Sequence, residues 1–169
     1  MARSLLIALL LSLGLAPAFG AEPKLPSSCA DAAYRQFDYW LGDWNVATAD
    51  GKLVGRDRVQ KVYGGCVVQE HWTSVDGGTG GSYSIYDFTR KVWHQTWVDS
   101  TGTLLVLEGG LKDGHMLLTG DNTLPGGRRA MNRMSWIPMD GKLRQLWEVS
   151  EDNGKTWKVV FDVYYTKAD

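Results

Sequence analysis

The chain has 169 residues, with 18 lysine and arginine side chains against 19 aspartate and glutamate side chains and a formal net charge of −1 at pH 7. A near-neutral balance without a long run of one sign gives no electrostatic footprint for nucleic acid or for an anionic membrane surface. The length suits one domain with a substantial core, in which roughly 70% of the unfolded chain's surface is buried.

The N-terminal segment 1–20 has the layout of a secretory signal peptide. Arg3 precedes an apolar run, and Ala18 and Gly20 are small residues of the kind that precede cleavage. The apolar run is short for a membrane span. We therefore predict a signal peptide over 1–20, cleaved within a few residues of Gly20, a linker over 21–30, and a secreted or periplasmic product without membrane insertion. A retained N-terminal anchor helix is the alternative.

The two cysteines are Cys29 and Cys66. An even count in an exported chain favours one disulfide, because the receiving compartment is oxidising. The bridge would staple the N-terminal segment to an early strand and contribute about 3–4 kcal/mol in the chain-entropy model. Two free thiols are the alternative if the chain is not exported.

The rest of the chain predicts one short helix followed by strands. The helix is expected over 31–41, before Gly42. Nine turn signals such as "ADGK", "DGGTGG", "LKDG" and "MDGK" then separate β-rich runs. They predict ten strands over 43–48, 53–62, 66–74, 81–88, 91–98, 103–109, 114–120, 129–137, 142–149 and 156–165.

The connections between these strands are too short for crossover helices, so neighbours are expected to pair antiparallel as a meander. A flat sheet would expose two edges, whereas closure removes both edges and encloses a cavity. We predict an all-β domain over 31–169, a closed and roughly ten-stranded barrel. The strands lack the sustained outward apolar alternation of a membrane barrel.

One turn carries a known motif. The string "SEDNGKTW" over 150–157 fits the aspartate box of sialidase propellers. A propeller needs several copies of its signature, and the chain has one. We interpret the box as a hairpin corner, in which Asp152 accepts backbone N–H bonds, Gly154 supplies a positive φ and Trp157 covers the turn.

The string "FDYWLGDW" over 37–44 places a Gly-x-Trp after the short helix. With "GGCVVQEHW", "GGSYSIYDFTRKVWHQTWVDSTG", "LEGGLKDGHMLLTG", "RMSWIP", "LRQLWEVSEDNGKTW" and "FDVYY", it resembles a bacterial family of secreted, lipocalin-like domains of unknown function. The resemblance implies a calycin-type barrel, like that of lipocalins and fatty-acid-binding proteins, with Trp44 closing one end. It implies little about activity.

Period-two alternation divides each strand into two faces. We assign the faces that combine aromatic and polar side chains to the interior, because such side chains suit a cavity wall; the opposite assignment stays open. The predicted lumen residues are Glu70, Trp72, Gln95, Trp97, Arg133, Gln145 and Trp147. Arg133 is expected either to pair with Glu70 or to anchor a ligand's carboxylate or polar head.

Other chemistry finds less support in the sequence. His71, His94 and His115 lie on separate strands without metal-ligand spacing, and no nucleophile motif is present. We predict no metal site, no catalytic residue and no cofactor. Carboxylates such as Asp99 with Glu70 or Glu148 are the remaining arrangement for acid–base work.

These features favour an exported barrel that binds a partly apolar or cyclic small molecule in its lumen, without covalent chemistry and without nucleic acid as a partner. The first alternative is a calycin-type lyase, isomerase or cyclase that uses Glu70, Asp99 or Arg133 in the same pocket. The second is a module that binds a protein or a glycan through the rim loops near 76–81 and 124–128. This second alternative predicts an interior filled by side chains.

Overall fold

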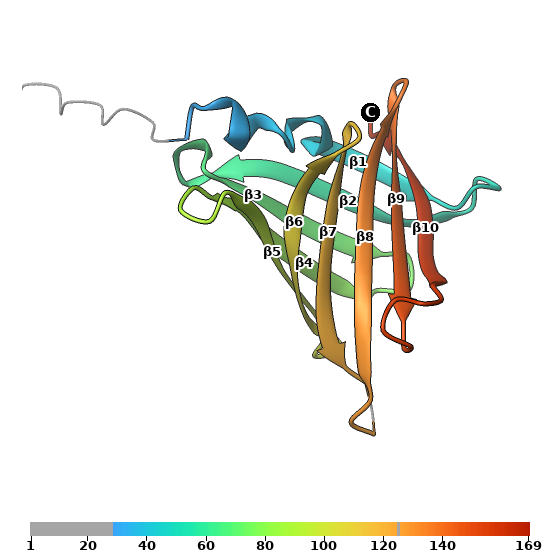
Figure 1. Cartoon of the computed structure of the whole chain (residues 1–169). Coiled ribbons are helices and arrows are strands. Elements are labelled where there is room, and N and C mark those ends of the chain that lie inside the picture. The colour runs from blue at the N-terminus through green and yellow to red at the C-terminus, as the bar shows by residue number, and fades with distance from the viewer. Residues whose placement is uncertain (1–28, 125) are drawn as a thin grey trace, which may run out of the picture.

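The fold is an all-β barrel, seen in a computed structural model that describes residues 29–124 and 126–169 (Figure 1). Ten antiparallel strands follow one another round the barrel in sequence order, and the first strand pairs with the last. The predicted closed ten-stranded meander is therefore confirmed. The predicted signal peptide over 1–20 and most of the predicted linker lie outside the described residues.

All ten predicted strands are present, most within two residues of the expected bounds. They are β1 (Gly42–Ala47), β2 (Leu53–Val62), β3 (Val67–Ser74), β4 (Thr79–Asp87), β5 (Val92–Asp99), β6 (Leu104–Lys112), β7 (His115–Thr123), β8 (Arg129–Met139), β9 (Lys142–Ser150) and β10 (Lys158–Lys167). The end of β6 was predicted too early, at "LEGG". The strand continues past Gly109 to Lys112. A Cβ at Gly109 would collide with the backbone of Leu117 on β7. The glycine permits a close approach of two strands rather than a turn.

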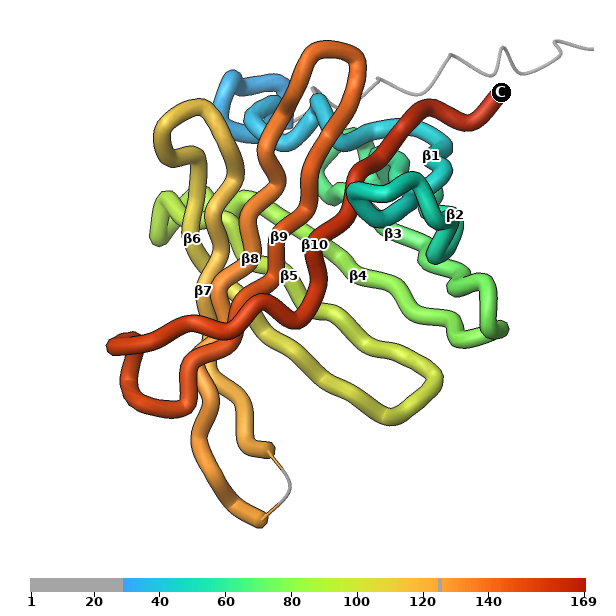
Figure 2. The backbone as a smooth tube through the Cα atoms, turned by 90° about the vertical axis from the view of Figure 1, so that its right-hand side faces the viewer, coloured from blue at the N-terminus to red at the C-terminus, as the bar shows by residue number. Residues whose placement is uncertain are grey.

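Closure is completed where β10 runs beside β1, which Figure 2 shows from the side. Trp44 on β1 is opposite Lys167 on β10, and Val46 is opposite Tyr165. Because both strands have neighbours on their other side as well, the described barrel has no free sheet edge. An exposed edge is a template for aggregation, which closure removes.

The predicted helix over 31–41 is instead two short 3-10 turns, η1 (Ala32–Arg35) and η2 (Asp38–Trp40). Phe37, between them, has φ −106° and ψ 9°, outside the helical range, and neither turn has a side-chain N-cap hydrogen bond. Both turns lie across one end of the barrel (Figure 1). A third 3-10 turn, η3 (Tyr63–Gly65), joins β2 to β3.

A disulfide ties this N-terminal segment to the barrel. Cys29 is bonded to Cys66, directly after η3, with 4.9 Å between their Cα atoms. The predicted pairing is confirmed, and a structural disulfide indicates an oxidising compartment.

Aromatic side chains close the barrel beneath the two 3-10 turns. We call this set the aromatic plug; it consists of Phe37, Trp40, Trp44, Trp93 and Trp136. The Phe37 ring lies 4.8 Å from that of Trp40 and 5.1 Å from that of Trp136, centroid to centroid. Trp44 Nε1 donates to the Trp40 carbonyl oxygen at 2.8 Å, so Trp44 lies at the closed end, as the resemblance implies.

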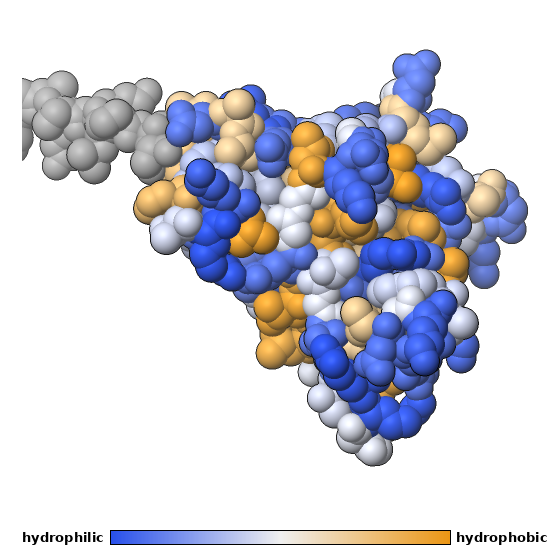
Figure 3. Space-filling view, viewed as in Figure 1, coloured by the Kyte–Doolittle hydropathy of each residue, from blue (hydrophilic) through white to orange (hydrophobic). Residues whose placement is uncertain are grey.

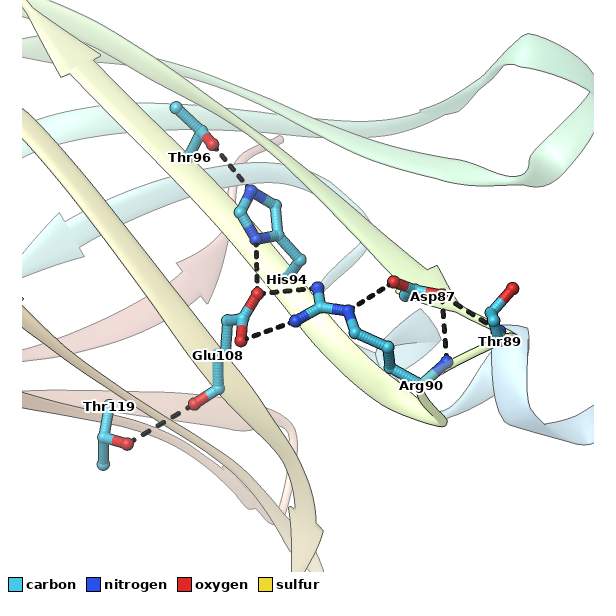
Figure 4. A network of polar contacts seen from close by, with 7 residues as sticks. All are labelled: Asp87, Thr89, Arg90, His94, Thr96, Glu108 and Thr119. Atoms are coloured by element: carbon cyan, nitrogen blue, oxygen red, sulfur yellow. Dashed lines mark hydrogen bonds and ion pairs between the residues drawn. The ribbon is translucent and has the colours of Figure 1, made fainter.

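The outer surface is mixed in polarity. Figure 3 shows hydrophobic side chains over the strands of one face, broken up by hydrophilic ones. On the outside of β4 to β6, Arg90 bridges Asp87 and Glu108, and Glu108 also contacts His94 (Figure 4). These contacts join three strands across the exposed face.

No helix within the described residues is long and apolar enough to cross a membrane.

The turn over 151–157 has the predicted corner chemistry. The Asp152 carboxylate accepts hydrogen bonds from the backbone N–H and the hydroxyl of Thr156. Gly154 has φ 81°, and the Trp157 indole donates to the Gly154 carbonyl oxygen. The aspartate box therefore shapes a loop between β9 and β10.

Candidate functional site: a lumen of aromatic rings and carboxyl groups

The barrel interior contains a cavity of about 200 Å³, which we call the lumen cavity. Its walls come from six strands of the barrel, β3, β5, β6, β8, β9 and β10. They are formed by Glu70, Trp72, Gln95, Trp97, Asp99, Leu105, Met134, Gln145, Trp147, Phe161 and Tyr165. Six of the seven predicted lumen residues are among them, so the aromatic and polar faces of these strands point inward. A filled interior, expected of a module that works only through its rim, is not what the structure shows.

The half of the cavity farther from the aromatic plug is mainly aromatic. The half-buried rings of Trp72 and Phe161 meet edge to face, 6.2 Å apart. Trp97 is held by a hydrogen bond of 3.2 Å from its indole Nε1 to Asp99. Trp147 donates in the same way to Asn132 at 3.0 Å. These bonds fix the orientation of two of the indoles, so part of the wall is preorganised.

Two glycines make room for the tryptophan rings. A Cβ at Gly80 on β4 would lie 2.5 Å from the Trp97 ring, and a Cβ at Gly55 on β2 would collide with the Trp72 ring. Neither glycine has a positive φ, so their role here is space rather than backbone conformation. Each indole therefore packs against a neighbouring strand and lines the lumen cavity from there.

The deeper half of the cavity is polar and closely hydrogen-bonded. Glu70 Oε2 accepts a hydrogen bond from the Ser82 hydroxyl at 2.5 Å. Gln95 donates to the Ser84 hydroxyl at 3.0 Å. On the opposite wall the Tyr165 hydroxyl donates to Gln145 Oε1 at 2.6 Å. Such buried networks hold their members in one arrangement.

A second carboxyl group lies beside Glu70 without a counterion. Asp57 on β2 is 2% exposed, and neither of its carboxyl oxygens accepts a hydrogen bond from the described residues. Burial raises the pKa of Asp57, and the charge of Glu70 raises it further, while the nearby backbone N–H of Arg58 acts in the opposite direction. Burial also raises the pKa of Glu70, against the hydrogen bond from Ser82. The pair therefore retains protons at a pH where exposed carboxyl groups have lost theirs.

These raised pKa values predict that the protein becomes less stable as the pH rises. The unfolded chain releases both protons near pH 4, whereas the folded chain holds them to higher pH. The contribution of these two groups to folding stability is complete at a pH below their pKa values in the unfolded chain. It is lost as the pH rises through their pKa values in the folded protein, by at most about 1.4 kcal/mol per pH unit and group. We expect the free energy of unfolding, measured with guanidinium chloride, to fall between pH 5 and pH 8.

The matched variants for this prediction are Asp57→Asn and Asp140→Asn. Asp57→Asn should flatten the decrease, because the amide does not titrate. Asp140, exposed in the turn between β8 and β9, should leave the decrease unchanged when replaced. Stability that is constant or rises over this pH range in the unmodified protein contradicts the buried-pair assignment.

Asp99 lies at the wall of the cavity but is an ionised group. Burial opposes its ionisation, but hydrogen bonds from Thr101, Thr103 and Trp97 outweigh that effect and lower its pKa. Its Oδ1 accepts from the backbone N–H of Thr101 at 2.9 Å, and its Oδ2 accepts from Trp97. Asp99 therefore orders the turn after β5 and places a fixed negative charge beside the Trp97 ring.

Arg133 does not line the lumen cavity, and its predicted position there was wrong. Its neighbour Met134 faces inward, whereas the Arg133 side chain points outward. It pairs with Glu148 on β9, with 2.8 Å between Nη2 and the carboxylate. Its guanidinium also lies 4.2 Å from the centre of the Trp157 ring. Arg133 therefore fastens the loop over 151–157 to the barrel wall and is not available to anchor a ligand inside.

The histidines lie outside the cavity. His94 Nε2 lies 2.9 Å from the Thr96 hydroxyl on the outer face of β5, and Nδ1 faces Glu108 (Figure 4). His71 borders a second, larger hollow of about 760 Å³ on the outer surface of β1 to β3, where Arg58 pairs with Asp43. We take the smaller lumen cavity as the candidate site, because it is concave, aromatic and lined by few polar groups.

Sequence reasoning missed Asp57, Ser82, Met134, Phe161 and Tyr165 as inward residues. Their signal is the same alternation that placed the others, since Tyr165 shares a face with Phe161, and Asp57 shares one with Val59. The polar neighbours Arg56 and Arg58 hid Asp57, because an aspartate between two arginines is typical of an exposed strand edge.

The fold and this site define the class: a closed ten-stranded antiparallel barrel, compatible with a calycin-like fold, with an aromatic and acidic internal cavity. Comparison with protein-family models gave no match, and a search of curated proteins gave none.

Proposed function

We propose that this protein is an exported barrel that binds a small cyclic molecule in its lumen without covalent chemistry. The observation that carries the proposal is the cavity itself, in which three tryptophans and a phenylalanine surround a deeper layer of polar groups. A cavity of roughly 150 Å³ holds one benzene molecule, so about 200 Å³ suits one ring with a short substituent. The signal-like N-terminal sequence and the disulfide support export.

Native mass spectrometry tests this proposal on protein purified from its own envelope fraction. We expect a co-purifying mass of one small molecule that is released on denaturation. The same protein should gain thermal stability with single-ring compounds, because a ligand at 100 times its Kd adds about 2.7 kcal/mol. Protein that is empty, and whose Tm responds to no ring compound, contradicts small-molecule binding.

Gly80→Ala should weaken this binding. The added methyl group would lie 2.5 Å from the Trp97 ring and 3.0 Å from the Val98 carbonyl oxygen, so the indole must move toward the lumen. Because overpacking of this kind costs about 1–3 kcal/mol, we expect the Kd of the bound molecule to rise about tenfold or more in a calorimetric titration.

Gly110→Ala is the matched control for this prediction. Gly110 also lies within a strand, β6, and a Cβ there would meet nothing within 4 Å. The control should bind as the unmodified protein does. An unchanged Kd in Gly80→Ala, with a shifted Trp97 indole N–H signal in the NMR spectrum to show that the ring has moved, contradicts binding against this wall.

A proton-transfer enzyme of the calycin type is the second candidate. It is favoured by one observation, the raised pKa of Glu70, since burial brings this carboxyl group toward the range of a general acid or base. The two candidates separate in Glu70→Gln. An enzyme should lose turnover and still hold its ligand, whereas a binding protein should change only in affinity.

A further inference from the structure

The charged side chains that line the lumen cavity are all acidic. Its lining includes two acidic side chains, Glu70 and Asp99, and no lysine, arginine or histidine among the described residues. Lys167 on β10 is turned to the closed end of the barrel. Its Nζ lies 3.5 Å from the centre of the Trp44 ring and donates to the Leu41 carbonyl oxygen at 2.7 Å. An anionic ligand would therefore meet carboxyl groups without a compensating cation.

The Glu70 carboxyl group has one oxygen available to a ligand. Glu70 Oε2 is occupied by the Ser82 hydroxyl, which leaves Oε1 for a ligand. Behind Glu70 lies Asp57, almost fully buried and without a hydrogen-bond partner among the described side chains and backbone. The described side chains supply no positive partner to this pair, so its carboxyl groups hold their protons instead. A ligand with a positive charge would supply that partner and allow Glu70 to ionise.

The aromatic wall suits the same ligand. The faces of tryptophan rings carry negative electrostatic potential, and cations are bound by several such faces at once. Trp72, Trp97 and Trp147 line the part of the cavity above Glu70, and the ionised Asp99 fixes one of these rings. A neutral ring could stack there equally well. Only a cation is attracted by the ring faces and also by the two acidic lining residues, Glu70 and Asp99.

We propose that the lumen selects a cation: a single-ring compound that carries an ammonium group, with the ring among the tryptophans and the ammonium at Glu70. This inference rests on the proposed function, since it names the class of small molecule that the lumen binds. The ammonium donates hydrogen bonds to Glu70 Oε1 and forms an ion pair with it. Binding below neutral pH therefore displaces a proton from the buried pair.

The test compares three compounds of similar size and different charge by isothermal titration calorimetry: benzylammonium, benzyl alcohol and benzoate. We expect benzylammonium to bind at least about tenfold more tightly than benzyl alcohol, and benzoate not to bind measurably. If benzyl alcohol or benzoate binds as well as benzylammonium, the lumen is a binding site but the cation inference is wrong. If none of the three binds, the proposed function fails for single rings, and the inference fails with it.

A pH series on the unmodified protein gives a second measurement that needs no variant. The titratable groups that face Glu70 are Asp57 on β2, Tyr165 on β10 and Asp99 on β5. The affinity for benzylammonium should rise from pH 5 to pH 8, by up to about tenfold per unit, while that for benzyl alcohol stays constant. A flat benzylammonium series overturns the placement of the ammonium at Glu70.

Glu70→Gln and Glu108→Gln form the matched pair of variants. Both replace one carboxyl group by an amide, but Glu108 lies on the outer face of β6, where it pairs with Arg90. Glu70→Gln should lower the affinity for benzylammonium about tenfold or more and change that for benzyl alcohol by less than about threefold. Glu108→Gln should leave both affinities unchanged. Equal losses in the two variants mean that long-range charge, not the lumen, determines the preference.

Discussion

Phe37→Ala is expected to lower the free energy of unfolding by about 3–5 kcal/mol, the range for a large aromatic side chain removed from a core. Phe37 is 0% exposed and lies within 6 Å of four other rings, centroid to centroid: those of Tyr39, Trp40, Trp93 and Trp136. Its removal leaves a hole at the centre of the aromatic plug that the rigid strand ends cannot fill. Guanidinium chloride unfolding, followed by tryptophan fluorescence, measures the loss.

Phe88→Ala is the matched control, since it removes the same side chain from a different environment. Phe88 is 73% exposed in the turn between β4 and β5, so its loss should cost less than about 0.5 kcal/mol. If both variants lose the same stability, the N-terminal turns do not close the barrel in the way the structure shows. A large loss in Phe37→Ala alone also means that segment 32–40 belongs to the folding unit of the strands.

The fold could be predicted because its signals are local. Turn strings such as "DSTG" and "EDNGK" indicate where strands end. The short connections between strands allow only antiparallel neighbours. Closure followed from the need to remove two sheet edges. The errors were also local: β6 was predicted to end at Gly109, but the strand continues to Lys112.

The site could be predicted only in part. Alternation divides a strand into two faces, but one residue must be known to be buried before the inner face can be told from the outer one. On β8 the buried Trp136 puts Met134 and Asn132 on the inner face and therefore Arg133 on the outer one. The prediction placed Arg133 by its charge, as a partner for Glu70, instead of by counting from Trp136. Asp57 shares a face of β2 with the buried Val59, but the prediction missed it because Arg56 and Arg58 on either side are typical of an exposed strand.

The same dependence on distant parts of the chain applies to the N-terminal turns, whose stability we expect to require the disulfide. The double variant Cys29→Ser with Cys66→Ser should lower the free energy of unfolding by about 3–4 kcal/mol, because the bridge closes a loop between residues 37 positions apart and so restricts the unfolded chain. Within the native state, η1 and η2 have few backbone hydrogen bonds of their own and no side-chain N-cap bond. Release of Cys29 should therefore speed amide hydrogen exchange over 32–40 more than in β8 and β9.

Reduction of the unmodified protein provides the control for this last prediction. A reductant should lower the Tm of the unmodified protein toward that of the double variant and leave the Tm of the double variant unchanged. Should the double variant retain its full stability and its slow exchange over 32–40, the aromatic plug is held by packing alone. The disulfide would then stabilise neither the plug nor the closed end of the lumen cavity, and the stabilisation expected from restricting the unfolded chain would have to be offset by residual structure in that chain.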